Sequence, residues 1–486
     1  MAMIKIWLGG FGLLILLTGC LSHVQTIPKG NGGSPFPKFP DQDNRIVGIA
    51  LSGGGSRAAF FGMSALKALA KLRAEPDKPS LIEQIDYISS VSGGSVAASY
   101  FAMKKKDQGV PVLSASGEFT DGYKTFFDEY RKAMSHNYQK SFEWRQFYKV
   151  RWFNPAQRAK SLAEVLDELY LSKQGGEGVD SFTLGDLYER EKGGHSPRLI
   201  LNATLYNNGR RFVITTLPKE DFENDILSKI GCPEVDPNQL CPAYLEDAVN
   251  RFDPMTFEEI EADPRGLPIS YGVAASASFP PIIGPITVCV GGVDENEKCK
   301  GKRYWHAGDG GLVDNQGLES LLQAVAKELE RAKQSGNPKR ALVLLFDSGL
   351  PFNAGEDQLD GSEKGFEVFI NDPARIVGIM EQRAFMYQRL FWHIARANLP
   401  PGQLVPSEDQ LKLIVMRHTD ASIEMEELPT SCQDEGFTSK KMIEKYIASI
   451  PTLFKIRSKC DEDLLELAAK KVVYDKRGDI IDFLKN

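Results

Sequence analysis

Two consecutive stretches of the chain repeat one plan, and that plan constrains the fold more than any other feature. The first is RIVGIALSGGG (45–55), a short apolar run that ends in glycines, followed by SRAAFFGMSALKALAKL (56–72), which has apolar residues at helical spacing. The second is IDYISSV (85–91) followed by SGGSVAASYFAMKKK (92–106). Repeated strand, tight turn and helix predict an α/β fold, a three-layer sandwich in which helices cover a largely parallel central sheet. Ligands of such sheets bind beyond the carboxyl ends of the strands, where both glycine clusters fall.

The turn after the second strand places a serine at a position suited to a nucleophile. The stretch from Ser90 to Gly94 fits the pattern G-x-S-x-G around Ser92, with serine in place of the first glycine. A sharp turn of this kind presents the serine hydroxyl above the sheet, and the small residues Ser90 and Gly94 allow it to form. Two alternatives stay open: Ser95, which fits a relaxed form of the pattern one turn further into the helix, and a glycine-rich turn without chemistry.

The earlier glycine cluster suits an anion. Gly53, Gly54 and Gly55, with Arg57 nearby, place consecutive backbone N–H groups where they can converge on the oxyanion of an acyl-transfer intermediate. The same glycines fit a relaxed dinucleotide-binding pattern, but that pattern needs an acidic residue at the end of the second strand, where this chain has Ser89, Ser90 and Val91. A purely structural glycine turn is the remaining alternative.

A nucleophilic serine also needs a base, and the stretch YWHAGDGGLVDNQG (304–317) offers one. Asp309 is followed by Gly310 and Gly311, which predicts a turn at the end of a strand, before a helix that begins near residue 316. The alternatives are a structural turn in which Asp309 bonds only to local backbone, and His306 as the base.

Taken in order, these three motifs resemble those of the patatin-like phospholipases, over roughly residues 45–350. The resemblance implies a lipid acyl hydrolase with a Ser92–Asp309 dyad and an oxyanion hole from Gly53, Gly54 and Gly55 with Arg57. No cofactor is expected, and calcium dependence stays open although no calcium-loop pattern is visible. The stretches LILNATLYNNGRRFVIT (199–215) and AASASFPPI (274–282) are similar to the family's hairpin and to its A-S-x-A-x-P turn. The chain departs from the family pattern at Ser90, which replaces the elbow glycine, and at Ala58, which replaces a glycine after the arginine.

Two other functions remain possible on the sequence. One is an α/β-hydrolase with a Ser-His-Asp triad in which His393 or His418 activates Ser92. The other is a catalytically silent lipoprotein that binds lipid or organises the envelope. The formal net charge of −7 disfavours nucleic acid as a partner, because nucleic-acid binders carry a basic face. A membrane lipid or lysophospholipid is the expected substrate.

The amino terminus predicts export. Residues 1–19 have one lysine and a short apolar run, which is typical of a signal peptide, and LTGC (17–20) resembles the bacterial lipobox, in which Cys20 would be acylated. A plain signal peptide and an uncleaved anchor are the alternatives. We expect residues 20–44 to be a Pro/Gly-rich tether and the protein to be anchored by lipid in the bacterial envelope.

Cysteine usage agrees with an exported protein. The pairs closest in sequence predict three short disulfide loops, with free buried thiols as the alternative: Cys232 with Cys241, Cys289 with Cys299, and Cys432 with Cys460. No Cys-x-x-Cys spacing occurs, which disfavours a zinc site.

The rest of the chain predicts one catalytic domain over residues 45–425 and a helical extension over 426–486 packed on it. A helical insertion over about 115–195 is rich in aromatic and basic residues between 123 and 160. Such a mixture suits either an element at a lipid interface or an ordinary helical cap that packs its aromatic side chains.

Overall fold

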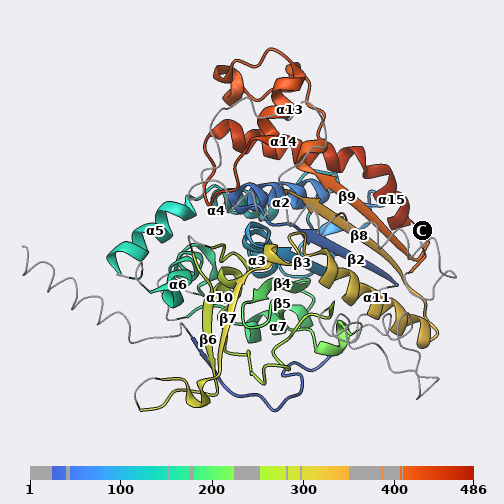
Figure 1. Cartoon of the computed structure of the whole chain (residues 1–486). Helices are drawn as coiled ribbons and strands as arrows, with labels where there is room; N and C mark the ends of the chain where they lie inside the picture. The colour runs from blue at the N-terminus through green and yellow to red at the C-terminus, as the bar shows by residue number, and fades with distance from the viewer. Residues whose placement is uncertain are drawn as a thin grey trace, which may run out of the picture.

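The computed structural model describes residues 25–39, 44–149, 151, 154–173, 180–223, 252–280, 283–295, 298–349, 386, 406–407 and 409–485. One mixed sheet of nine strands runs through this part of the chain (Figure 1), in the order β1-β6-β7-β4-β3-β2-β8-β9, with β5 paired to β4. The five strands at its centre and one side are mutually parallel: β2 (Arg45–Leu51), β3 (Tyr87–Val91), β4 (Arg198–Leu205), β8 (Arg340–Asp347) and β9 (Leu411–Arg417). The other four are β1 (Gln25–Ile27), β5 (Arg210–Thr215), β6 (Ile286–Val290) and β7 (Tyr304–Asp309).

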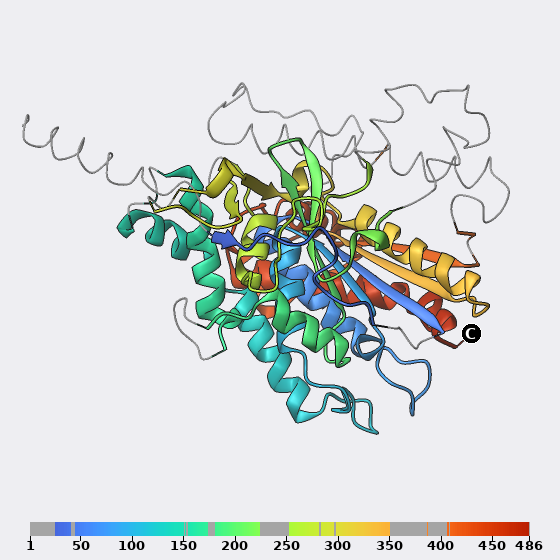
Figure 2. The ribbon, with the colours of Figure 1, turned by 90° about the horizontal axis from the view of Figure 1, so that it is seen from below.

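Helices cover both faces of the sheet, as Figure 2 also shows. On one face, α2 (Gly55–Leu69) and α3 (Gly93–Lys104) pack against Ile49 and other alternate residues of β2. On the opposite face, α11 (Leu318–Gln334) packs Leu321 against Ile46 and its neighbours. Because side chains alternate between the faces of a strand, one apolar strand supplies two cores. The three-layer α/β sandwich predicted from the sequence is therefore confirmed.

The insertion between α3 and β4 is helical, with one buried and one exposed set of aromatic side chains. It contains α4 (Asp121–Met134), α5 (Tyr138–Tyr148), α6 (Pro155–Leu166) and α7 (Leu184–Lys192). Phe126, Phe127 and Tyr130 of α4 are buried in the main core, as a packed cap requires. Trp144 and Phe147 of α5 are instead 64% and 73% exposed. The buried aromatic residues of α4 thus fit the expected helical cap, and the exposed ones of α5 fit the expected element at a lipid interface.

The amino-terminal segment differs from the tether expected there. Gln25–Ile27 forms β1, which pairs in parallel with β6 and extends the sheet at one edge. Further along, the ring of Phe36 is buried and stacks on Tyr188 of α7, with 5.2 Å between ring centroids. The local sequence is rich in Pro and Gly, yet its few apolar side chains find partners on the body of the protein. Cys20 and the rest of residues 1–24 lie outside the described residues.

The described chain ends in three helices: α13 (Lys440–Ala448) and α14 (Lys459–Asp475) at the top of Figure 1, and α15 (Arg477–Lys485) at its right, near β9. Helix α14 packs Leu464 and Leu465 into the core that contains α2. In the described parts of the chain, no helix has the length and apolar composition needed to cross a bilayer.

Two of the three predicted disulfides are confirmed. Cys289 is bonded to Cys299 beside the β6–β7 hairpin, and Cys432 is bonded to Cys460 at the start of α14. Cys232 and Cys241 lie outside the described residues.

Candidate active site

Ser92 occupies the sharp turn between β3 and α3 that the sequence predicts. Its backbone has φ 51° and ψ −121°, one of three non-glycine residues with positive φ among those described. L-residues rarely adopt such a conformation, so the surroundings must hold it. The backbone N–H of Ser92 donates a hydrogen bond of 3.1 Å to Oγ of Ser276, at the end of α10 (Ile269–Ser276). This contact fixes the turn from the side of a neighbouring helix.

The register of the sheet brings Asp309 to this turn. Val91, the last residue of β3, pairs with Asn202 of β4, and the adjacent Ala203 pairs with Asp309 at the end of β7. The hydroxyl of Ser92 consequently lies near the carboxylate of Asp309, whose pKa it lowers as a hydrogen-bond donor. Oδ1 of Asp309 also accepts a 2.8 Å hydrogen bond from the backbone N–H of Gly311. Two residues that are more than two hundred positions apart in sequence are thus neighbours at the carboxyl end of β3.

Burial changes the acidity of Asp309. The side chain is only 2% exposed, and this desolvation raises its pKa from 3.8 to about 7, against the opposing effect of the hydrogen bonds from Gly311 and Ser92. A carboxyl group with a pKa near neutrality has a useful affinity for a proton at physiological pH, unlike an ordinary aspartate.

Two glycines of the motifs are required by close backbone contacts. A Cβ atom on Gly94 would lie 2.4 Å from the carbonyl oxygen of Leu51, and one on Gly310 would lie 2.4 Å from that of Asn202. These contacts bring the turn of Ser92 and the turn of Asp309 close to their neighbouring strands. Ser90, in contrast, lies within β3 and is absent from the positive-φ residues, so serine there replaces the family glycine without backbone strain.

The other candidate serine and histidines are engaged elsewhere. Oγ of Ser95 is buried and bonds to the hydroxyls of Ser276 and Ser90 at 2.8 and 3.1 Å. Nδ1 of His306 bonds to the hydroxyl of Thr287 at 2.8 Å, and burial lowers its pKa. His418 is buried, its Nδ1 lies 3.4 Å from the carbonyl oxygen of Asp347, and burial with the nearby Arg57 lowers its pKa to about 3. His393 lies outside the described residues.

Not all backbone amides of the glycine cluster have a hydrogen-bond acceptor among the described residues. The N–H of Gly53 donates to the carbonyl oxygen of Asn315 at 2.7 Å. Gly54 and Gly55, at the amino end of α2, have φ of 140° and 60°, and their N–H groups have no acceptor among the described residues. The guanidinium of Arg57 donates to the carbonyl oxygen of Ser348 and to two groups of the carboxyl-terminal extension. Of the three glycines predicted for an oxyanion hole, Gly54 and Gly55 therefore have amides without an acceptor among the described residues, whereas the amide of Gly53 is engaged.

A family model supports what this geometry indicates. The model described as Patatin-like phospholipase matches residues 49–322, more than half of the 486 residues. The chain belongs to the patatin-like phospholipase family. The matched range contains the glycine cluster, the turn of Ser92 and Asp309, so all three motifs of this patatin-like chain lie inside it.

Solved structures give distant matches to this patatin-like chain. Human GIVD cytosolic phospholipase A2 matches at 11% identity and a TM-score of 0.41, covering 92% of this chain and 61% of that one. The same human protein in complex with methyl gamma-linolenyl fluorophosphonate matches at 13% identity and a TM-score of 0.39, over 92% and 60% of the two chains. VipD from Legionella pneumophila matches at 13% identity and a TM-score of 0.27, over 91% and 71%. The chain thus spans about three fifths of the human structures. No curated protein matches its sequence.

Two residues at the patatin-like site were not predicted from the sequence. Ser276 bonds to the backbone of Ser92, and Asn202 donates from Nδ2 to Oγ of Ser89 at 2.8 Å beneath the turn. Asn202 carries a usable signal, because it is the one amide side chain within the apolar run of β4, and a buried polar side chain needs partners. Within the described parts of the chain, no group of three or more His, Cys, Asp or Glu residues is placed to hold a metal ion.

Proposed function

We propose that this protein is a lipid acyl hydrolase of the phospholipase A or lysophospholipase type, with Ser92 as nucleophile and Asp309 as its base. The observation that carries the proposal is the place of Ser92, held at a strained turn, beside a buried carboxylate whose pKa is raised to about 7. A serine hydroxyl is a weak nucleophile until an adjacent base takes its proton, and this pair supplies one.

The reaction divides between two steps. As Oγ of Ser92 attacks the ester carbonyl, its proton passes to Asp309, and the carbonyl oxygen becomes an oxyanion. The N–H groups of Gly54 and Gly55 are the donors proposed for that oxyanion, assisted by the amino end of α2. The intermediate then expels the alcohol, which takes the proton from Asp309, and leaves an acyl ester on Ser92. Asp309 next takes a proton from a water molecule that attacks the acyl ester, and returns it to Oγ of Ser92 as the fatty acid leaves.

Lipid anchoring is a separate part of the proposal. The segment LTGC and the apolar run before it support acylation of Cys20 and export to the bacterial envelope. The Cys289–Cys299 and Cys432–Cys460 disulfides agree with an oxidising compartment. Mass spectrometry of the mature amino terminus tests this, because an acylated Cys20 has a lipid mass that is absent from a Cys20→Ser variant. An unmodified Cys20 in membrane fractions would argue against the anchor.

Labelling by a fluorophosphonate probe, with hydrolysis of a short-chain ester in parallel, tests the dyad. We expect Ser92→Ala and Asp309→Asn to lose both signals, whereas Ser95→Ala and His418→Gln keep labelling of Ser92. Full labelling of Ser92→Ala would place the nucleophile elsewhere, and loss of activity in His418→Gln without unfolding would favour a triad. A folded wild type without labelling would favour a silent lipid-binding protein.

A further inference from the structure

Residues 450–454, between α13 and α14, touch the glycine cluster directly, and we call them the strap. The carbonyl oxygen of Leu453 accepts a hydrogen bond of 2.7 Å from the backbone N–H of Ser56. A Cβ atom on Gly55 would lie 2.4 Å from that same oxygen. The strap therefore meets the glycine cluster backbone to backbone, and only glycine at position 55 permits so close a contact.

Arg57 ties the strap to the first turn of α2. Its guanidinium, 1% exposed, donates to the carbonyl oxygen of Ile450, to Oγ1 of Thr452 at 2.9 Å and to the carbonyl oxygen of Ser348 at 2.6 Å. A planar guanidinium with several donors in a fixed fork is well suited to hold three acceptors in one geometry. Arg57 thus links the strap, the residue after β8 and the helix that follows the glycine cluster.

The other side of the strap is held by the insertion. The carbonyl oxygen of Phe454 accepts a 2.9 Å hydrogen bond from the N–H of Gln139 in α5. The ring of Phe454 packs edge to face on Phe142 of the same helix, with 5.6 Å between centroids. The strap consequently spans from α5 to the glycine cluster.

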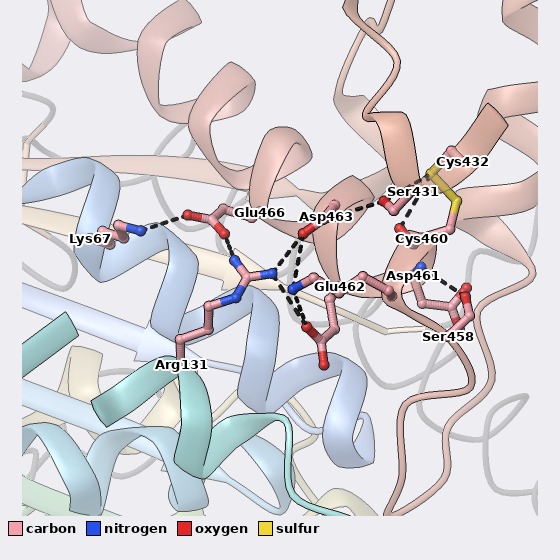
Figure 3. A network of polar contacts seen from close by, with 11 residues as sticks. Lys67, Arg131, Ser431, Cys432, Ser458, Cys460, Asp461, Glu462, Asp463 and Glu466 are labelled. Carbon is pink, nitrogen blue, oxygen red and sulfur yellow. Dashed lines mark hydrogen bonds and ion pairs between the residues drawn. A yellow bond between two sulfur atoms is a disulfide. The ribbon is translucent and has the colours of Figure 1, made fainter. Parts of the chain in front are cut away.

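The segments on both sides of the strap are fixed to the core, as Figure 3 shows. Arg131 of α4 forms ion pairs with Glu462, Asp463 and Glu466 of α14, and Lys67 of α2 pairs with Glu466 at 2.7 Å. Cys432, bonded to Cys460, joins the segment before α13 to the first turn of α14. The strap cannot shift far while these contacts hold.

We infer that the strap is part of the catalytic centre, although it lies outside the range of the family match. It fixes the glycine cluster so that the amides of Gly54 and Gly55 have no acceptor within the described parts of the chain, which makes Arg57 a positioning residue. Leu453 is half-exposed and its backbone lies against Gly55, so we assign its side chain to the border of the acyl site. The inference rests on the proposed function, because it assigns these residues to the oxyanion site of that reaction.

The first test compares Phe454→Ala with Phe437→Ala in the full chain. Phe437 is a matched control, since it is also a half-buried aromatic of the extension, packed edge to face on Tyr446, 5.1 Å away. Phe454→Ala should lower kcat and the rate of fluorophosphonate labelling about tenfold, with KM changed less than about twofold, because misplaced oxyanion donors weaken the transition state more than substrate binding. Phe437→Ala should lower Tm to a similar extent and leave both rates unchanged.

A second variant tests the place of Leu453. Leu453→Ala should lower the ratio of kcat/KM for palmitoyl over butyryl esters about tenfold, because an apolar contact favours the longer chain. Leu428→Ala, which alters another half-buried leucine of the extension, should leave the ratio unchanged. An unchanged ratio in Leu453→Ala would remove Leu453 from the acyl site.

The outcomes separate the two proposals. A wild type that is active, with Phe454→Ala and Phe437→Ala equally affected, overturns the role of the strap and leaves the dyad intact. A folded wild type that neither labels nor hydrolyses an ester overturns the proposed function, and the role of the strap with it.

Discussion

If Asp309 is the proposed base, both the activity and the stability of the protein depend on pH through its carboxyl group. Its pKa is raised to about 7 in the folded state, chiefly by burial, from an unfolded value near 3.9. The fold therefore favours the protonated form, and that contribution to stability is complete below about pH 3.9 and is lost as the pH rises through about 7. Hydrolysis needs the carboxylate form, so activity should rise with pH with an apparent pKa of about 7.

The variant Asp309→Asn separates these effects. We expect it to be inactive, to have the Tm of the wild type near pH 4, and to have a higher Tm than the wild type at pH 8.5, because the amide cannot ionise. Calorimetry across pH measures this. Asp263 is the control, because Arg265 holds its pKa below the usual value, opposite to the shift of Asp309. Asp263→Asn should therefore give no increase in Tm at pH 8.5. An equal Tm for wild type and Asp309→Asn at both pH values would contradict the raised pKa.

Ser276 should matter to both the turn and the rate. Its Oγ accepts from the N–H of Ser92 and donates to the carbonyl oxygen of Asn202 at 2.6 Å. Ser276→Ala leaves these buried groups without partners, and we expect about 1–3 kcal/mol of lost stability and a lower kcat. Ser99→Ala, which removes two buried hydrogen bonds further along α3, should lose stability without a change in kcat. Equal kcat values for the two variants would show that Ser276 does not support the turn.

At the scale of elements, α5 presents aromatic side chains that no other described part of the chain covers. Trp144 lies 6.1 Å from both Phe147 and Tyr148, measured between ring centroids, and Lys140 is exposed one turn earlier. Aromatic residues with a flanking lysine suit the interface of a lipid bilayer. This supports α5 as the contact of the proposed enzyme with membrane lipid.

The double variant Trp144→Ser, Phe147→Ser tests that contact in a full-length Cys20→Ser background, where no anchor can mask the effect. We expect about tenfold weaker binding to vesicles of phosphatidylethanolamine and phosphatidylglycerol, with hydrolysis of a soluble ester unchanged. Tyr474→Ser, which changes an exposed aromatic residue of α14, is the control. Unaltered vesicle binding in the double variant would assign the exposed face of α5 another role.

Helices and strands that are determined by their own and neighbouring residues could be predicted from the sequence. Both strand–turn–helix units and helix α11 lie where apolar periodicity and glycines predict them, and the β4–β5 hairpin lies where the family resemblance implies it. The position of β7 next to β4 was not predictable from periodicity, since pairing depends on distant contacts. The strap shows the same limit, because Leu453 and Ser56 are about four hundred residues apart and meet through backbone groups that every residue type carries. Composition also did not predict β1, because the segment is dominated by Pro and Gly and only a few of its residues pair with β6.

For the whole molecule, the disulfide between Cys432 and Cys460 connects stability with activity. It closes a loop with a sequence separation of 28. Removing both cysteines by substitution with serine should destabilise the protein by about 3–4 kcal/mol on the loop-entropy model. Because the loop contains the strap, the double variant should also lose activity well below its Tm, as measured by ester hydrolysis at several temperatures.

The other described disulfide is the control for this prediction. Cys289→Ser with Cys299→Ser opens a loop with a separation of 10 beside β6, away from the glycine cluster, and should lower Tm while activity at low temperature is kept. If both double variants keep full activity below their melting temperatures, the disulfide at α14 serves stability alone.

The pairing of β1 with β6 determines how such an enzyme would meet its substrate. If Cys20 carries the lipid, five residue steps separate it from Gln25, which is already fixed in the sheet, and these can span at most about 18 Å. A domain joined to its lipid anchor by so short a linker cannot reach other membranes. It would bind only lipids of the leaflet that holds its own anchor. Those lipids would reach the site by lateral diffusion in the plane of the membrane rather than by collision from solution.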